Sequence, residues 1–254
     1  MSEFLTTALK AIDKASKITK KYYQSSLQIE IKADKTPVTI ADKEAEQIII
    51  ETIHKDFPNH SFYGEESGTT KNDEEFLWII DPIDGTKNFI GGIPLWGTLL
   101  ALKQNDETIL GISHIPGMNE ILHAEKNNGA FLNNRQVNVS GIDTVGQAML
   151  SFGSFKPFQE KGYEKGLMKL IADTKRQRSF GDLYPYHLLA SGRLEIVCEA
   201  AIKIVDVAPF EIIIKEAGGK TSDFQGNNIS MAVTTFLAAN AEIHTSVLNN
   251  YFLS

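Results

Sequence analysis

The stretch FLWIIDPIDGT, residues 76–86, joins a continuous apolar run to two aspartates and a glycine. The five apolar residues 76–80 are typical of a strand that is covered on both faces, and we expect this strand to stop at Asp81. Pro82 stiffens the turn so that Asp84 comes back beside Asp81, and two carboxylates this close repel each other unless a cation lies between them. For an isolated DxxDG segment, the alternative is an ordinary turn in which aspartate and glycine are the usual residues.

The residues that follow the two aspartates favour anion binding. Gly85 and Thr86 lead into Lys87-Asn88-Phe89. A short helix that begins there would offer free backbone N–H groups to an anion next to the metal. The Thr86 hydroxyl is also suited to hold an attacking water.

Three further acidic residues stand where an element turns or begins. Glu65 lies in the segment GEES (64–67), which taken alone is typical of a solvated, charged turn. Asp42 stands at the start of an expected helix, where the helix dipole favours an acid in any case. Asp206 stands at the start of another, where its alternative role is an N-cap, with Pro209 tolerated in the first turn.

The hydrophobic periodicity of the whole chain predicts a layered α/β or α+β protein. Apolar residues at helical spacing predict helices over roughly Glu3–Gln24 and Ala41–Phe57. Beyond the 76–80 strand, a strand-rich middle gives way to alternating strands and helices. The expected strands are Gly97–Leu102, Thr108–Ser113, Glu120–Ala124, Gly129–Leu132, Met149–Gly153 and Leu194–Cys198, and the expected helices are Glu160–Asp173, Tyr184–Ala190, one that starts just after Asp206, and Ala241–Phe252.

The composition excludes several classes of protein. A chain of 254 residues with 42% hydrophobic residues can bury a sizeable core. A net charge of −7 without a basic stripe argues against a nucleic-acid partner. No run approaches a membrane span and the first residues lack the apolar segment of a signal peptide, so we expect a cytoplasmic protein without a membrane partner. The single cysteine, Cys198, can form neither an intramolecular disulfide nor a thiolate zinc site.

Together the four acidic segments are far more specific than any one of them. The segments TIAD, GEES, DPIDGT and VDVA resemble those of the inositol monophosphatase superfamily, and the match runs from about residue 35 to 220. The resemblance implies a lithium-sensitive, magnesium-dependent phosphatase with the layered αβαβα sandwich of the inositol monophosphatase and fructose-1,6-bisphosphatase type. It also implies a homodimer. One departure is Val205, where the family usually has Trp, and we expect it to change local packing and not the ligand set.

The resemblance also implies a role for each matching residue. Glu65, Asp81, Asp84 and Asp206 look like side-chain ligands of two or three Mg²⁺ ions, which prefer hard oxygen ligands. The carbonyl of Ile83 would be a further ligand. The implied catalytic residues are Asp42, Glu65 and Thr86, of which Asp42 and Thr86 would orient the nucleophilic water. The phosphate would be bound by Gly85 and Thr86. The substrate would be contacted by Asp84, Asp182, Glu199 and Asp206.

Two segments are similar to those of the histidinol-phosphate phosphatase branch. They are GGIPLWGTLLAL (91–102) and RSFGDLYPY (178–186), which resemble the patterns PxWGTLIAL and RxxGDxYxY. Asp182 replaces the small residue of true inositol monophosphatases, whereas Glu199 matches their glutamate that binds substrate hydroxyls. Without a substrate role, Asp182 would be the N-cap of the helix that follows. We expect Tyr184, Tyr186 and His187 to be core residues of that helix.

We therefore expect a phosphomonoesterase that acts on a small phosphate ester, preferably L-histidinol phosphate. The runner-up substrate is myo-inositol phosphate or a related sugar phosphate. A rival of another class is a non-catalytic regulator that binds metal or phosphate. We expect residues 1–254 to form one compact unit, with a subdomain division near 141–146 and the active site between the halves.

Overall fold

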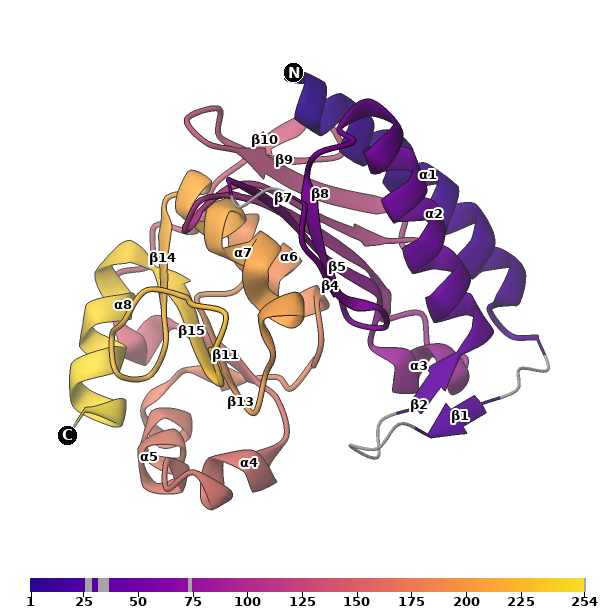
Figure 1. Cartoon of the computed structure of the whole chain (residues 1–254). Coiled ribbons are helices and arrows are strands. Elements are labelled where there is room, and N and C mark those ends of the chain that lie inside the picture. Colours follow the sequence, from indigo (N-terminus) through magenta and orange to yellow (C-terminus); the bar gives the residue numbers. More distant parts are fainter. Residues whose placement is uncertain (26–28, 32–36, 73–74, 254) are drawn as a thin grey trace.

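In the computed structural model, residues 1–25, 29–31, 37–72 and 75–253 are described. The predicted αβαβα layering is confirmed: helices cover the outer face of a first sheet, a pair of helices separates it from a second sheet, and more helices cover the far side (Figure 1). Lys35 and Thr36, which open the segment that leads to Asp42, lie outside the described residues. None of the described helices is both long enough and apolar enough to cross a bilayer.

The outer layer consists of α1 (Glu3–Tyr22) and α2 (Ile40–Asp56), close to the two helices predicted. The Ser2 hydroxyl caps α1 by accepting the Leu5 N–H at 3.1 Å. The apolar stripe of α1 and Ile49 and Ile53 of α2 pack on one face of the first sheet. The short strands β1 (Ile29–Ile31) and β2 (Pro37–Thr39) pair with each other just before α2 begins.

The first sheet has eight strands in the order β10-β9-β8-β7-β6-β5-β3-β4. Its only parallel pair among the described strands is β3 with β5, and every other neighbour is antiparallel. The strands are β3 (Ser61–Gly64), β4 (Gly68–Thr70), β5 (Phe76–Asp84), β6 (Gly97–Gln104), β7 (Glu107–Ile115), β8 (Glu120–Glu125), β9 (Ala130–Leu132) and β10 (Arg135–Val137).

The central strand β5 is buried on both faces. Trp78 and Ile80 point toward α1 and α2, whereas Ile79 points into the layer between the two sheets. The prediction that this strand stops at Asp81 is wrong, because β5 continues to Asp84. Asp81 pairs with Leu99 and Asp84 with Gly97, so three steps along β5 oppose two steps along β6, which is a one-residue bulge.

The second sheet has the order β12-β11-β13-β15-β14 and lies beyond α6 (Tyr184–Ala190) and α7 (Ile204–Glu216). Residues of both helices form one core between the sheets. Val205, which replaces the family Trp, is buried in that core. The strands are β11 (Met149–Phe152), β12 (Arg176–Gln177), β13 (Ile196–Ala200), β14 (Gly219–Ser222) and β15 (Thr235–Asn240).

The last layer covers the far face of the second sheet. Here the predicted helix Glu160–Asp173 is found as α5 (Glu164–Asp173), but its predicted start is wrong. Glu160 ends a separate helix, α4 (Phe155–Glu160), and Gly162 lies between the two helices at a φ of +79°. The chain ends in α8 (Ala241–Val247), which continues as a π-helical turn, η2 (Leu248–Phe252), as the predicted helical pattern indicates.

The connection between the two sheets runs from residue 138 to 148 and includes the 3₁₀ turn η1 (Val145–Gln147). The expected subdomain division at 141–146 falls within it. That the two parts behave as subdomains stays a prediction.

Candidate active site

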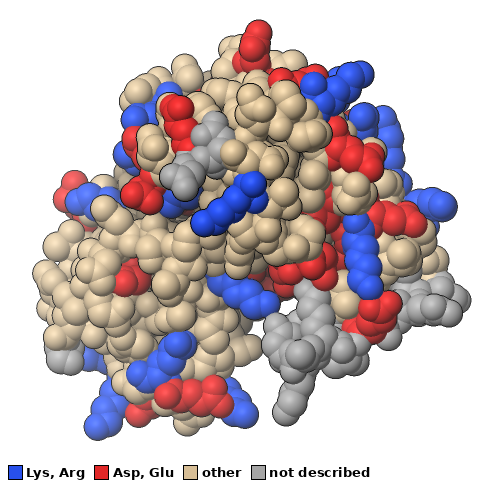
Figure 2. Space-filling view, in the orientation of Figure 1, with Lys and Arg blue, Asp and Glu red and all other residues tan. Residues whose placement is uncertain are grey.

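A cavity of about 570 Å³ lies between the two sheets, next to the first turn of α7. On the face shown in Figure 2, acidic side chains gather where the two parts of the molecule meet. Nine of the ten predicted site residues line this cavity, and the tenth, Asp42, does not. The nine are Glu65, Asp81, Ile83, Asp84, Gly85, Thr86, Asp182, Glu199 and Asp206.

The bulge in β5 turns Asp81 and Asp84 to the same side. In a regular strand, residues three apart point to opposite faces. The extra residue of the bulge brings both side chains to the same face. Pro82, which has no N–H, is tolerated here because residues 82 and 83 are not paired with β6. The bulge is held by two hydrogen bonds, one from the Ile83 N–H to Oδ1 of Asp81 at 3.0 Å and one from the Thr98 hydroxyl to the Pro82 carbonyl at 2.9 Å.

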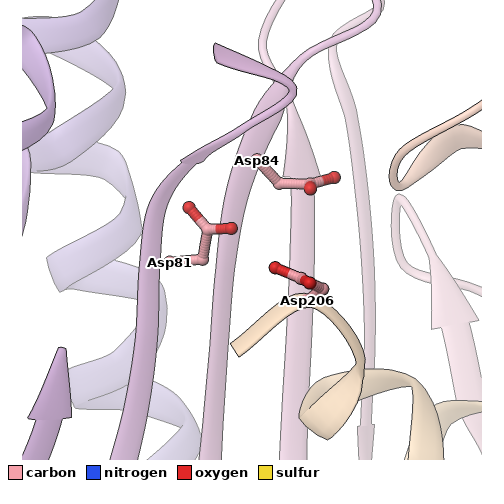
Figure 3. A group of neighbouring side chains, drawn as sticks. All are labelled: Asp81, Asp84 and Asp206. Atoms are coloured by element: carbon pink, nitrogen blue, oxygen red, sulfur yellow. The ribbon is translucent and has the colours of Figure 1, made fainter. Parts of the chain in front are cut away.

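Asp206 meets this pair from the opposite wall. One carboxylate oxygen of each of Asp81, Asp84 and Asp206 lies within 4.8 Å of the others (Figure 3). The expectation that α7 starts after Asp206, with Asp206 as N-cap, is wrong because α7 begins at Ile204. Asp206 is the third residue of the helix and accepts the Lys203 N–H at 2.7 Å, as in a capping box. One carboxylate therefore both closes the helix end and faces the other two.

The three carboxylates are buried close together and repel one another unless a cation lies between them. Burial raises the pKa of Asp81 and of Asp84 well above the ordinary value, and the neighbouring carboxylates raise both further. Burial is also the main reason that the pKa of Asp206 is raised to about 6. Oδ2 of Asp84 is buried and accepts no hydrogen bond from the described residues. An orphaned buried oxygen in an all-oxygen cluster fits a hard divalent cation.

Glu65 lies at the edge of this cluster. It follows β3, and its N–H donates to the Ile80 carbonyl at 3.1 Å, which ties it to the strand that carries Asp81. Its side chain is only 16% exposed and lies 3.7 Å from Nζ of Lys203. Glu65 is therefore directed into the cavity, unlike a side chain of a solvated turn.

Asp42 lies near the cluster but is engaged in capping α2. Its Oδ2 accepts the Thr39 N–H at 2.7 Å and the Thr39 hydroxyl at 2.6 Å. Burial raises the pKa of Asp42, these two bonds lower it, and the charge of Glu65 raises it again. The structural alternative, a first-turn acid, therefore describes what Asp42 contacts. Its catalytic role stays a prediction.

Gly85 and Thr86 begin α3 (Thr86–Ile90), the short helix that the sequence predicts. Gly85 has a φ of +79°, and a Cβ there would lie 3.0 Å from the Leu95 carbonyl oxygen and 3.3 Å from Oδ2 of Asp182, so only glycine fits. The Thr86 hydroxyl donates to the Ile83 carbonyl at 3.0 Å.

Asp182 lies in the segment between β12 and α6 and faces Asp84 across the cavity. Its Oδ2 accepts a hydrogen bond from the Asn88 side chain at 2.7 Å. The alternative of a helix cap is wrong, because Leu183 holds the N-cap position of α6 and no side chain caps it. Burial raises the pKa of Asp182, and Lys87 lowers it.

Glu199 closes the cavity from the end of β13. Its Oε1 is buried and accepts no hydrogen bond from the described residues. Burial, followed by the charges of Asp182 and Asp206, raises the pKa of Glu199 to about 8, and a bond from the Gly153 N–H opposes this. Glu199 is thus poised to meet a donor or a cation in the cavity.

Some lining residues were not predicted as site residues. Asn88 and Lys87 stand in the DPIDGTKN stretch itself, so proximity to the aspartates could have indicated them. Tyr186 was expected in the core and does stack on Phe210, with ring centroids 4.1 Å apart, but it also lines the cavity. The core interpretation of His187 is confirmed: it lies 2.8 Å from the Ser113 hydroxyl and 3.1 Å from Glu120.

Comparison with known proteins gives consistent matches over nearly the whole chain. Residues 1–252 match the model of the inositol monophosphatase family. A histidinol-phosphatase of Chlorobaculum parvum is 36% identical over 89% of this chain and 88% of its own length. Among solved structures, the extragenic suppressor protein suhB of Bartonella henselae superimposes with a TM-score of 0.92 at 28% identity, covering 98% of each chain. An IMPase of Thermotoga maritima superimposes with a TM-score of 0.88 at 32% identity, covering 98% of this chain and 97% of that one.

Proposed function

This chain belongs to the inositol monophosphatase family and is a phosphoric monoester hydrolase, and we propose that it hydrolyses L-histidinol phosphate to histidinol and phosphate with Mg²⁺. The observation that carries the metal-dependent part is the cluster of Asp81, Asp84 and Asp206 in a cavity large enough for a small ester. The proposal makes this a step of histidine biosynthesis in the cytoplasm.

The metal would be held by oxygen atoms that already line the cavity. They are the carboxylates of Glu65, Asp81, Asp84 and Asp206 and the carbonyl of Ile83, and we propose two or three ions per site. When bound, Mg²⁺ supplies Lewis-acid chemistry, lowering the pKa of a water and stabilising the charge of the leaving alkoxide. The ordinary repulsion among the buried carboxylates is then balanced by the cations.

The chain's own groups would orient the water and the phosphate. The single hydroxyl proton of Thr86 is donated to the Ile83 carbonyl, so the Thr86 oxygen is left to accept a hydrogen bond from a water. Asp42, together with Thr86, would orient the same water. The backbone N–H groups at Gly85 and Thr86, at the start of α3, would hold the phosphate oxygens.

The preference for histidinol phosphate rests on Asp182 and Glu199. Histidinol phosphate carries an ammonium group beside its ester, and a carboxylate in a partly enclosed cavity forms a strong, charge-assisted hydrogen bond with ammonium. The C. parvum histidinol-phosphatase supports this choice. Inositol phosphate stays the second candidate, since Glu199 suits a hydroxyl donor and the T. maritima relative is named an IMPase.

A panel of purified esters tests the proposal. Phosphate release from histidinol phosphate, inositol 1-phosphate and glycerol phosphate is measured with Mg²⁺ and after exhaustive chelation. We expect activity only with Mg²⁺ and the highest kcat/KM on histidinol phosphate. Full activity after chelation would overturn the metal mechanism, and a preference for inositol phosphate would move the assignment to the second candidate.

Two further points belong to the proposal. A non-catalytic regulator is the rival function, and absence of phosphate release from every ester with Mg²⁺ present would favour it. We also propose a homodimer, from the family resemblance, and light scattering that gives a 28.1 kDa particle at micromolar concentration would exclude it.

A further inference from the structure

The turn that carries Glu65 is held by a buried carboxylate that no part of the proposed chemistry uses. Three consecutive backbone N–H groups of this turn donate to defined acceptors. Glu65 donates to the Ile80 carbonyl at 3.1 Å, and Glu66 and Ser67 donate to Glu46. Oε2 of Glu46 lies 2.9 Å from the Glu66 nitrogen, and Oε1 lies 2.8 Å from the Ser67 nitrogen.

Glu46 is seated tightly against this turn. Glu46 is only 2% exposed, although it lies on the second turn of the outer helix α2. The approach is possible because residue 64 is glycine: a Cβ there would lie 2.5 Å from the carboxylate carbon and from both oxygens of Glu46. Gly64 and Glu46 therefore form a fitted pair, and the carboxylate cannot shift along the turn without losing a hydrogen bond.

The helix that supplies Glu46 also supplies Asp42. The two residues are four apart, so they lie one above the other on the same face of α2. One face of α2 therefore binds two segments next to the site: Asp42 binds Thr39, and Glu46 binds the turn that carries Glu65.

We propose that Glu46 is a positioning residue that fixes the backbone of Glu65 so that this side chain is presented to a divalent cation. The inference rests on the proposed function, in which Glu65 is a metal ligand. A carboxylate is required because it offers two acceptor oxygens to two parallel N–H groups. Groups that orient a metal ligand in this way typically contribute about 10- to 100-fold to metal affinity or activity.

Glu46→Gln keeps the size of the side chain but removes one acceptor. The amide NH₂ then faces one of the two backbone N–H groups, so that donor loses its partner and the turn must move. The matched control is Glu216→Gln. Glu216 also holds two backbone N–H groups, those of Asn127 and Gly129, both at 2.8 Å, but it lies at the other end of α7 from Asp206.

Calorimetric titration of MgCl₂ alone into the purified proteins gives a readout that does not depend on activity. We expect Glu46→Gln to bind Mg²⁺ about 10- to 100-fold more weakly than the wild type, and Glu216→Gln to bind as the wild type does. The Mg²⁺ concentration for half-maximal phosphate release should rise by the same factor. At saturating Mg²⁺ much of kcat should return, which a general loss of structure would not allow.

Unchanged Mg²⁺ affinity together with an unchanged number of binding sites in folded Glu46→Gln would overturn the inference. If Glu46→Gln does not yield folded protein, Gly64→Ala perturbs the same contact from the turn side, and the same results apply to it. A wild type that neither binds Mg²⁺ nor hydrolyses any ester would instead defeat the proposed function.

Discussion

Replacing Asp206 with asparagine should separate stability from catalysis. The amide of the Asp206→Asn protein would keep an oxygen for the Lys203 N–H and would turn its NH₂ donor toward Asp81 and Asp84. The ionised Asp206 carboxylate lowers the stability of the folded protein, because burial raises the pKa of Asp206 from 3.8 to about 6. A gap of about two pH units corresponds to about 3 kcal/mol of unfolding free energy.

The sign of the effect depends on pH. Above pH 6, Asp206 is ionised in both the folded and the unfolded protein, so the ionised group lowers the stability of the wild type by the full amount. Near pH 4, Asp206 is protonated in the folded protein and only partly ionised in the unfolded one, and the penalty falls below about 1 kcal/mol. Asp206→Asn should therefore be more stable than the wild type at pH 7.5, and nearly equal to it at pH 4.

Urea unfolding in EDTA at the two pH values measures both free energies, and phosphate release with Mg²⁺ should fall by orders of magnitude. Asp223→Asn is the control: Asp223 also accepts backbone N–H groups, at 2.9 and 2.7 Å, but in an exposed loop, and its loss should not stabilise the protein. An Asp206→Asn protein that is less stable than the wild type at pH 7.5 would refute the electrostatic reasoning. An equal gain at both pH values would do so too.

Three other predictions concern single positions. Asp84→Asn, at the buried oxygen without a hydrogen-bond partner, should lower kcat by orders of magnitude with an unchanged circular dichroism spectrum; near-normal turnover would mean that Asp84 has been misassigned. Asp182→Asn should lower kcat/KM about 10- to 100-fold more for histidinol phosphate than for glycerol phosphate, because only the former offers an ammonium group; equal losses would remove the amine contact from the proposal. Burial lowers the pKa of His244 from 6.5 to about 4, so its contribution to stability is complete above pH 6.5 and is lost as the pH falls toward 4. Between pH 7 and 5 urea unfolding should show the wild type losing about 2 kcal/mol more than His244→Gln, and parallel pH profiles would contradict this.

The parts of the structure that were predicted have strong local signals. The apolar stripes of α1 and α2 have helical period, and the run 76–80 is apolar without a break because β5 is covered on both faces. By contrast β15, Thr235–Asn240, was missed. It is fully buried, but its apolar run is only Phe236–Ala239 and half of that run is alanine, so that neither alternation nor length marks it as a strand.

The site was predictable in its residue types and not in its geometry. The spacing of Asp81 and Asp84 predicts proximity, but a bulge is a property of the pairing with β6, which the local sequence does not reveal. The hydrogen bonds that Thr39 donates to Asp42 likewise depend on where α2 begins. The later start of α5 did have a local signal, Gly162, whose positive φ separates α4 from α5.

The division of the cavity walls has a consequence for how such an enzyme can diversify. Asp81 and Asp84 lie on a central strand of the first sheet, whereas Asp182 and Glu199 belong to segments around the second. If Asp182 and Glu199 contact the alcohol as proposed, drift at these two positions would alter which alcohol is accepted and leave the metal-binding carboxylates unchanged. An inherited phosphatase scaffold could therefore be recruited to new metabolites by changes at a few positions around the second sheet, while Asp206 in that same half and the aspartates of the first sheet stay under the selection imposed by the metal.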